Sequence, residues 1–450
     1  MRATRLVPAH RRGDLRALLS RSRQVALVAA LLGAATGLLV AALDWLVIDV
    51  MFERVARRGP LLVATLPAAG LLVGLLVRRT IGGGVSGATA DEYLHAFHDH
   101  EYTLSWRPLV ARLVAAVATV GLGSPMGLEG PSLYGGATIG AAVQRRLPKV
   151  FRAADRRTLL VAGAAAAVAA IFKAPATGAV FALEVPYQDD IARRMLLPAL
   201  VAAATGYLGF VAVHGTAALF PVNGSPAFNV GDLLGAIGVG VVAAIGARAF
   251  AWMLRYAKDL AAGPRPIATT VAAGIVLGAA FAGGRLLTGE SLVVGPGYSV
   301  VDWARQPGHA TGVLAGMLAL RCLATAAAVA GGGTGGLFVP LVAGGALTGA
   351  LVHQSFGLGE RGLFVLVGVA AFLGAGYRVP LAAVMFVAET SGRPSFVVPG
   401  VLAAVAAELL MGRSSVTRYQ RRPGEHQPEL TTPTEQASTI EPPTIDPGAR

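Results

Sequence analysis

The stretch Gly121-Leu-Gly-Ser-Pro-Met-Gly-Leu-Glu129-Gly-Pro131-Ser-Leu-Tyr-Gly-Gly-Ala-Thr-Ile-Gly140 decides how the rest of the chain is interpreted. It places one carboxylate, Glu129, among glycines and a proline inside an apolar region. Pro131 marks a helix start, because proline is tolerated in the first turn, where its missing N–H costs nothing. The free N–H groups of that turn carry partial positive charge and attract anions. The stretch therefore predicts a broken helix that presents an anion site inside the membrane.

The composition is typical of a polytopic membrane protein. Of the 450 residues, 54% are hydrophobic and 14% are charged, whereas a soluble domain has about 25% charged residues. Several apolar runs are close to the length of about 20 residues that crosses a bilayer as a helix. We therefore expect an all-α membrane fold with spans at 25–46, 61–77, 159–183, 196–213, 237–253, 267–282, 313–330 and 362–387.

The positive charge indicates orientation in the bilayer rather than nucleic-acid binding. The net charge is +13, and Lys and Arg gather in short loops and at the termini, as the positive-inside rule expects. We therefore expect an integral protein of the plasma (inner) membrane with cytoplasmic N- and C-termini. Residues 1–24 are interpreted as a basic cytoplasmic arm. Residues 413–450 are polar and rich in Pro and Thr, which predicts a disordered cytoplasmic tail.

The chain contains an internal repeat. Matched spacings of arginine and proline, which are uncommon in membrane spans, argue against coincidence. Transporter folds built from repeats bind their substrate at the repeat interface, on discontinuous helices. We expect a membrane domain at 25–412, with repeat one at about 60–215 and repeat two at about 230–412. Arg112, Pro131 and Gly140 recur 209 residues on as Arg321, Pro340 and Gly349, and Pro175 and Glu184 recur 205 residues on as Pro380 and Glu389.

Three motifs carry a family resemblance. Gly127-Leu-Glu129-Gly-Pro131 resembles the Gly-Arg/Lys-Glu-Gly-Pro motif of the CLC family of chloride channels and chloride/proton antiporters. Gly336-Leu-Phe338-Val-Pro340 and the segment 163–185 are similar to two further CLC motifs. The resemblance spans about residues 25–420 and implies inverted halves and a homodimer with one pore per subunit. It also implies that Glu129 is the gate, whose carboxylate competes with the anion and carries the proton.

The resemblance places the anion pathway at backbone N–H groups of broken helices. The segment 82–86 departs from the family pattern, because Gly83 stands where a serine hydroxyl would coordinate chloride. The pore tyrosine of the family falls here at Val416 or Thr417, and Tyr419 lies two or three residues too late. We therefore expect weaker chloride selectivity and leave other small anions open. The expected pathway comprises Gly83, Gly84, Val85, Gly127, Gly130, Gly336, Leu337, Phe338 and Val339.

Val185 bears on the transport mechanism. In the antiporters of the family a second, proton-carrying glutamate follows the equivalent of Glu184, and this chain has Val185 there. Valine cannot bind a proton, and it is common at this position in the family's channels. The sequence therefore favours a passive, Glu129-gated chloride channel. A chloride/proton antiporter is the alternative, because water can carry protons where a side chain does not. Glu184 and Glu389 are expected to be mainly structural.

Two further features are ambiguous from sequence. Lys173 replaces the asparagine usual in the family and is either a pore-lining charge or a lysine that snorkels to an interface. The cluster His95, His98, Asp99, His100 and Glu101 lacks closed metal-ligand spacing and is interpreted as a solvated loop, so neither a metal nor another cofactor is expected.

An intramembrane enzyme is a remoter alternative. The chain contains no G-x-S-x-G, H-E-x-x-H or paired-aspartate motif. The run Gly331-Gly-Gly-Thr-Gly-Gly336 matches the dinucleotide pattern, but no alternation of strands and helices surrounds it. We therefore expect a transport protein rather than an enzyme.

Overall fold

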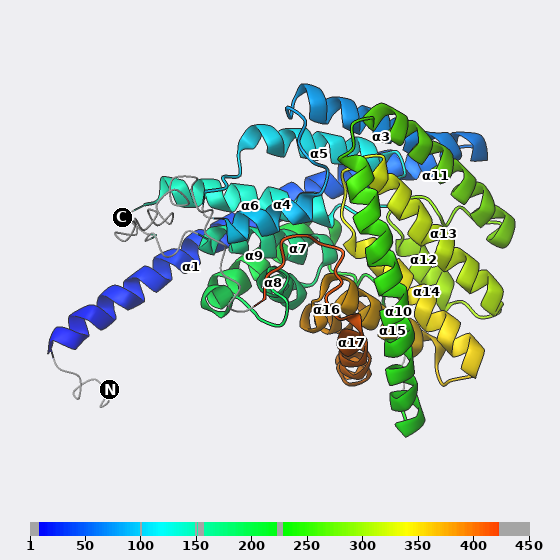
Figure 1. The fold of residues 1–450 in the computed structure, drawn as a ribbon. Coiled ribbons are helices and arrows are strands. Elements are labelled where there is room, and N and C mark those ends of the chain that lie inside the picture. The colour runs from blue at the N-terminus through cyan, green and yellow to red at the C-terminus, as the bar shows by residue number, and fades with distance from the viewer. Residues whose placement is uncertain (1–8, 100, 149–150, 152–156, 223–227, 423–450) are drawn as a thin grey trace, which may run out of the picture.

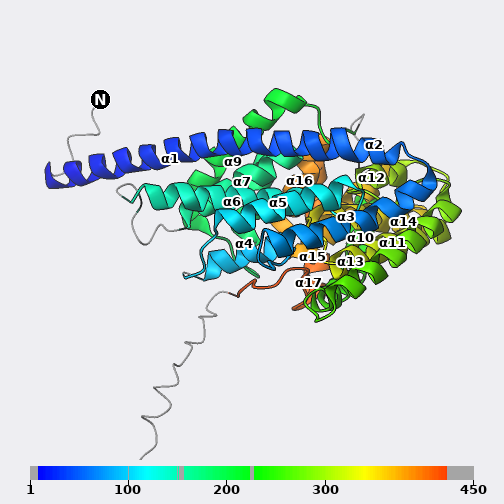
Figure 2. The ribbon, with the colours of Figure 1, turned by 90° about the horizontal axis from the view of Figure 1, so that it is seen from above.

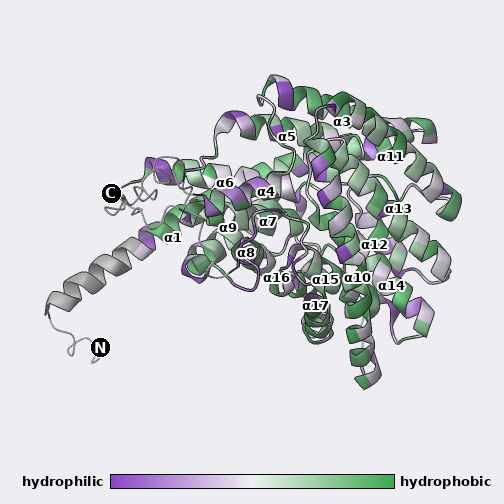
Figure 3. Ribbon diagram, viewed as in Figure 1, coloured by the Kyte–Doolittle hydropathy of each residue, from purple (hydrophilic) through white to green (hydrophobic). Residues whose placement is uncertain are grey.

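The computed structural model describes residues 9–99, 101–148, 151, 157–222 and 228–422, and in this part of the chain helices joined by loops are the regular structure, apart from two isolated β-bridges (Figure 1). The predicted all-α fold is therefore confirmed. Seven of its helices are long and apolar enough to cross a membrane. Figure 3 shows hydrophobic residues along much of these helices. Side chains such as Leu76 and Leu286 point outward, as expected for contact with lipid.

The first half runs from the long N-terminal helix α1 to the membrane-length helix α9. Figures 1 and 2 show α1 extending beyond the body of the molecule at its N-terminal end. The elements are α1 (Ala9–Asp44), a π-helical turn (Trp45–Phe52), α2 (Glu53–Ala56), α3 (Pro60–Thr80), α4 (Thr89–His98), α5 (Trp106–Gly121), α6 (Glu129–Arg146), α7 (Thr158–Phe172), α8 (Pro175–Glu184) and α9 (Leu196–His214).

The second half repeats this order from α3 onward. Helix α14 begins at Phe338, 209 residues after α6 begins at Glu129, and α16 begins 205 residues after α8. These are the two offsets expected from the sequence. The elements are α10 (Val230–Ala261), α11 (Pro266–Thr288), α12 (Tyr298–Arg305), α13 (Thr311–Ala330), α14 (Phe338–Phe356), α15 (Arg361–Tyr377), α16 (Pro380–Ser391) and α17 (Val397–Met411).

A reciprocal backbone bridge joins the two halves at their centre. Gly127 N–H donates to Gly336 O at 3.0 Å, and Gly336 N–H donates to Gly127 O at 2.7 Å. The two glycines are equivalent in the repeat, so a local two-fold axis passes through the bridge. Helices α6 and α14 both begin two residues after these glycines. The bridge therefore brings the N-termini of two broken helices together.

The short helices α8 and α16 exchange caps in the same symmetric manner. Glu184, at the end of α8, accepts the N–H groups of Leu381 and Ala382 in the first turn of α16 at 3.0 and 2.8 Å. Glu389, near the end of α16, accepts the equivalent N–H groups of Ala176 and Thr177 at 2.9 and 2.7 Å. Equivalent helices thus run antiparallel, which agrees with inverted repeats, and both carboxylates have the structural contacts expected of them.

Two equivalent buried arginines hold the loops that precede short helices. Arg112 donates from Nε to Ser86 O at 2.9 Å, just before α4. Arg321 donates to the carbonyl oxygens of Val293 and Pro296 at 2.9 and 2.8 Å, just before α12. Each guanidinium satisfies carbonyl groups that would otherwise lie unpaired in an apolar interior. The matched arginines seen in the sequence therefore position the starts of α4 and α12.

Both ends of the chain differ from the sequence-based boundaries. Helix α1 starts at Ala9, so most of the expected arm 1–24 continues directly into the first span. Residues 413–422, here called the return segment, are not a free tail, because they fold back against α4 and α10 and bury Ser415 and Val416. Hydrogen bonds to distant elements, rather than local propensity, order this polar segment. The remaining tail, 423–450, lies outside the described residues.

We expect Glu389→Ala to lower the free energy of unfolding by about 2 kcal/mol, because it removes a charged cap and leaves the first-turn N–H groups of α8 without their acceptor. Thermal unfolding in detergent, followed by size-exclusion chromatography, measures the loss. Glu290→Ala is the matched control, since Glu290 is exposed in a loop. Equal melting temperatures for Glu389→Ala and the control would contradict the capping role.

Candidate functional site

Glu129 lies at the contact between the two broken helices. It is the first residue of α6, and its side chain is only 4% exposed. Its Oε1 atom accepts N–H groups from Phe338 at 2.6 Å and from Val339 at 3.2 Å, the first two residues of α14. The carboxylate of one repeat therefore occupies the positive N-terminus of the equivalent helix in the other repeat, where an anion would also bind.

Glycines give the carboxylate room to reach this position. A Cβ atom added to Gly336 would lie 2.2 Å from Cδ of Glu129, and one added to Gly127 would lie 1.8 Å from Oε2. Neither approach is sterically possible for a residue with a side chain. The glycines on both sides of the bridge therefore permit the contact between Glu129 and α14.

The structure brings most of the predicted pathway together but not its first segment. Gly130, Gly336 and Leu337 lie beside Glu129 with Phe338 and Val339, as the sequence indicates. In the segment 82–86, however, the N–H of Gly84 donates to Arg78 O at 2.9 Å. This donor is therefore already paired with α3 rather than free for an anion. Gly84 and Val85 line a cavity, and Gly83 is exposed and does not.

A cavity of about 450 Å³, here called the gate cavity, reaches from these central residues toward one end of the molecule. Gly336, Leu337 and Met126 line its deep end, next to Glu129. Its walls come from the start of α4, the end of α10 and the return segment. The volume suffices for several water molecules, and the walls offer polar partners for them. Water and small ions therefore have space beside Gly336, which lies against the Glu129 carboxylate.

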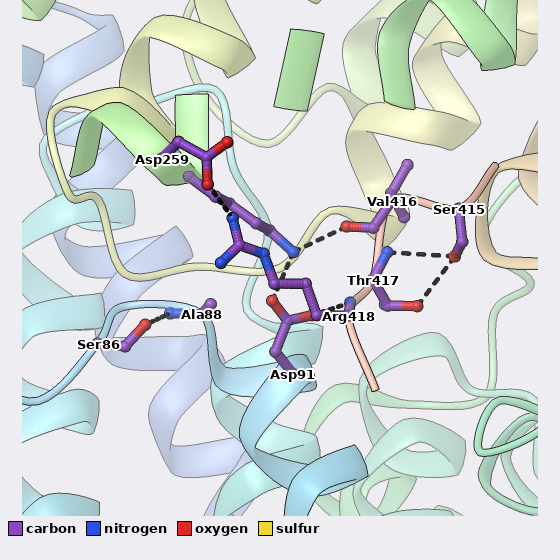
Figure 4. Close-up of polar contacts among 9 residues, drawn as sticks. Ser86, Ala88, Asp91, Asp259, Ser415, Val416, Thr417 and Arg418 are labelled. Carbon is purple, nitrogen blue, oxygen red and sulfur yellow. Dashed lines mark hydrogen bonds and ion pairs between the residues drawn. The ribbon is translucent and has the colours of Figure 1, made fainter. Parts of the chain in front are cut away.

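A buried ion pair between Asp91 and Lys258 lies in the wall of the gate cavity, and Figure 4 shows Asp91 with the return segment. Lys258 Nζ at the end of α10 lies 2.6 Å from Asp91 Oδ2 on α4 and donates to Val416 O at 2.8 Å. Arg418 N–H donates to the other carboxylate oxygen of Asp91 at 3.0 Å. Asp91 thereby ties the return segment to α4. Sequence analysis missed this contact, because Asp91 and Lys258 are 167 residues apart in the chain.

Val416 and Thr417, the two positions at which the family's pore tyrosine would fall, have different environments. Val416 is buried, and its N–H donates to Gly376 O at 2.9 Å. Thr417 lines the gate cavity, and its Oγ1 lies 3.0 Å from Ser415 Oγ (Figure 4). Tyr419 also reaches the gate cavity and stacks on His95 with 4.8 Å between ring centroids. Where the family has a tyrosine, the return segment thus offers the smaller hydroxyl of Thr417, which is already paired with Ser415.

Aromatic rings pack around the start of α14. The ring of Phe338 lies 4.2 Å from that of Phe172, 5.4 Å from that of Phe181 and 5.0 Å from that of Phe386, measured between centroids. All four rings are buried. This apolar packing lowers the local dielectric around the N–H groups that Glu129 contacts and so strengthens the attraction between them.

Lys173 ends α7 in a left-handed conformation with φ of 52°, and its repeat equivalent Arg378 ends α15 with φ of 58°. Asparagine tolerates this conformation better than most residues, which explains why a family member would carry it there. Lys173 Nζ donates to His214 O at 3.1 Å. Lys173 is not among the residues that line the gate cavity.

The histidine cluster is not the solvated loop expected from the sequence, because His95 and His98 lie in α4 and His98 is buried. His98 Nε2 lies 2.6 Å from Pro186 O, and His95 Nε2 lies 3.5 Å from Asp99 Oδ2. His100 lies outside the described residues. Within the described ranges, no three or more His, Cys, Asp or Glu side chains gather in a manner that suits a metal ion.

Val185, the position of the second glutamate, is buried at the end of α8. Its carbonyl oxygen accepts from Gln420 Nε2 at 2.9 Å, and Gln420 also donates to Tyr377 O at 2.7 Å. The return segment therefore covers Val185, which does not line the gate cavity.

Comparison with known proteins adds independent information. A family model described as voltage gated chloride channel matches residues 69–412. The H(+)/Cl(-) exchange transporter ClcA of Citrobacter koseri is 27% identical over 429 residues, which cover 89% of each chain. The same transporter of Salmonella typhimurium is 26% identical over 436 residues, which cover 91% of this chain and 90% of the relative.

Solved structures share the fold. A CLC-type fluoride/proton antiporter superposes with a TM-score of 0.76 at 22% identity, covering 89% of this chain and 98% of the other. A slow cyanobacterial Cl⁻/H⁺ antiporter superposes with a TM-score of 0.75 at 20% identity, covering 86% and 94%. Identities this low establish the architecture alone.

Proposed function

The chain belongs to the voltage-gated chloride channel (CLC) family, and we propose that it exchanges chloride for protons along a path gated by Glu129. The observation that carries the proposal is the buried carboxylate of Glu129 on the N-terminus of α14. The donors are backbone N–H groups, which recognise negative charge without requiring a particular anion. Relatives named as H⁺/Cl⁻ exchangers support chloride as the anion.

The competition at α14 couples the two ions. Ionised Glu129 accepts the N–H groups of Phe338 and Val339, so an anion can use these donors only when the carboxylate leaves. A protonated carboxyl carries no charge and accepts these bonds more weakly. Uptake of a proton by Glu129 therefore frees the site for chloride, and release of that proton lets the carboxylate displace chloride. One side chain thus takes part in the transfer of both ions.

The passive channel favoured by Val185 is not supported by the relatives, whose names state exchange. The valine at position 185 removes one proton-binding side chain but does not exclude a proton path through water. The gate cavity reaches Gly336 and Leu337, next to Glu129, and has space for water. A chain of water molecules can carry protons to the gate without a glutamate at position 185.

In lipid vesicles we expect a chloride gradient to drive protons against their own gradient, and the reversal potential to shift when only the proton gradient changes. Glu129→Gln keeps the shape of the side chain but cannot ionise, so chloride should move in this variant without protons. A pH-sensitive dye and a chloride electrode measure the two fluxes.

Glu290→Gln, an exposed carboxylate away from the gate, should behave as wild type. A wild-type reversal potential that stays at the chloride equilibrium value under every proton gradient would identify a passive channel and contradict the exchange proposal.

We also propose a homodimer in the plasma membrane with cytoplasmic termini. The long helices expose leucines widely, among them Leu208 on α9 and Leu409 on α17, so lipid or a second subunit must cover them. In mild detergent, light scattering should give a protein mass of about twice the subunit value of 45.8 kDa. A protein mass that corresponds to one subunit would refute the dimer.

A further inference from the structure

We propose that the hydroxyl of Thr89 binds the transported anion at the deep end of the gate cavity, in place of the serine that the segment 82–86 lacks. The inference rests on the proposed chloride transport and assigns a specificity-determining residue to it. Thr89 is the first residue of α4 and lines the gate cavity. Its side chain is only 1% exposed, and its Oγ1 has no hydrogen-bond partner among the described residues.

An unpaired buried hydroxyl is costly, which makes the position of Thr89 informative. Burial of a hydroxyl without a partner costs on the order of 1–3 kcal/mol, so most buried hydroxyls are paired. Within the part of the chain that the structure describes, Thr89 Oγ1 is an exception to this rule. A ligand that accepts a hydrogen bond inside the gate cavity would satisfy the hydroxyl.

The hydroxyl lies beside the gate. A Cβ atom added to Gly130 would lie 2.6 Å from Thr89 Oγ1 and 3.0 Å from Gly336 Cα. Gly130 follows Glu129, and Gly336 carries the central bridge. The Thr89 hydroxyl therefore borders the point at which the gate cavity meets the carboxylate. An anion that moved from the N-terminus of α14 into the gate cavity would come within hydrogen-bonding reach of the Thr89 hydroxyl.

The surrounding charges favour an anion over a cation. Helix α4 has no side-chain cap at its N-terminus, so its positive end is open to the gate cavity. Asp91 is paired with Lys258, and Glu92 lies 3.1 Å from Arg112. Arg78 lines the gate cavity and donates to the carbonyl oxygens of Val85 and Gly332, with no carboxylate partner among the described residues. Both acids on α4 are thus neutralised, whereas Arg78 retains its charge.

The hydroxyl of Thr417 is the alternative donor on the other wall. Its Oγ1 already has Ser415 Oγ as a partner at 3.0 Å, and the Thr417 N–H donates to the same oxygen at 3.2 Å. To bind an anion, Thr417 would have to give up this contact. Thr89 has no such bond to lose, so it is the better donor.

The test is chloride binding to the purified full-length protein in detergent by titration calorimetry. Thr89→Val keeps the branched shape but removes the donor, and we expect about 10-fold weaker chloride binding, the loss typical of one hydrogen bond to a charged ligand. Thr89→Ser restores the hydroxyl and should bind chloride as wild type does. If Thr89→Val does not fold, Thr89→Ala removes the same donor with less bulk.

Thr36→Val is the matched control, because Thr36 on α1 is also 1% exposed and its Oγ1 also has no partner within the described ranges, but it does not line the gate cavity. Equal chloride affinity in Thr89→Val, Thr36→Val and wild type would overturn the inference, as would a loss confined to Thr417→Val. Binding does not require proton coupling. Weakened binding in Thr89→Val therefore supports this inference even if vesicles show no exchange, and unchanged binding refutes it even if exchange is present.

Discussion

The contact between the Glu129 carboxylate and the N-terminus of α14 is the interaction on which the proposed transport depends. It exists because the bridge between Gly127 and Gly336 brings two broken helices together and because glycine leaves space for the carboxylate. Buried aromatic rings shield the same N–H groups on the side of Phe338. A charge that would be expensive to bury alone is stabilised there by a helix end, and in the proposed mechanism an anion replaces it.

The two repeats make equivalent contacts around the site but differ at the gate itself. Equivalent residues serve equivalent roles at the central bridge and at the caps from Glu184 and Glu389. The pair Glu129 and Phe338 breaks the symmetry, since equivalent positions hold a carboxylate in one repeat and an aromatic ring in the other. Two glutamates would repel each other across the axis, and two phenylalanines would leave no group to carry a proton. A single gate therefore requires unequal halves.

Local sequence signals predicted the frame of the fold but not its long-range contacts. The start of α6, the repeat offsets and the residues around Glu129 follow from proline, glycine and arginine spacing. The order of the return segment and the pair of Asp91 with Lys258 do not, because they join residues distant in sequence. The segment 82–86 indicated a missing hydroxyl, yet nothing local could show that Thr89 lies against Gly130. Val185 favoured a passive channel because the sequence does not reveal the cavity beside the gate.

The most direct test of the competition at α14 is the proton balance of chloride binding. Chloride titrations of the purified protein at one pH, in buffers of different ionisation enthalpy, report the protons taken up for each anion bound. Chloride that displaces the Glu129 carboxylate removes the donors that stabilise its charge, so wild type should take up protons, at most one for each anion. Glu129→Gln should bind chloride with no proton uptake. A wild-type binding enthalpy independent of the buffer would show that carboxylate and anion do not share the site.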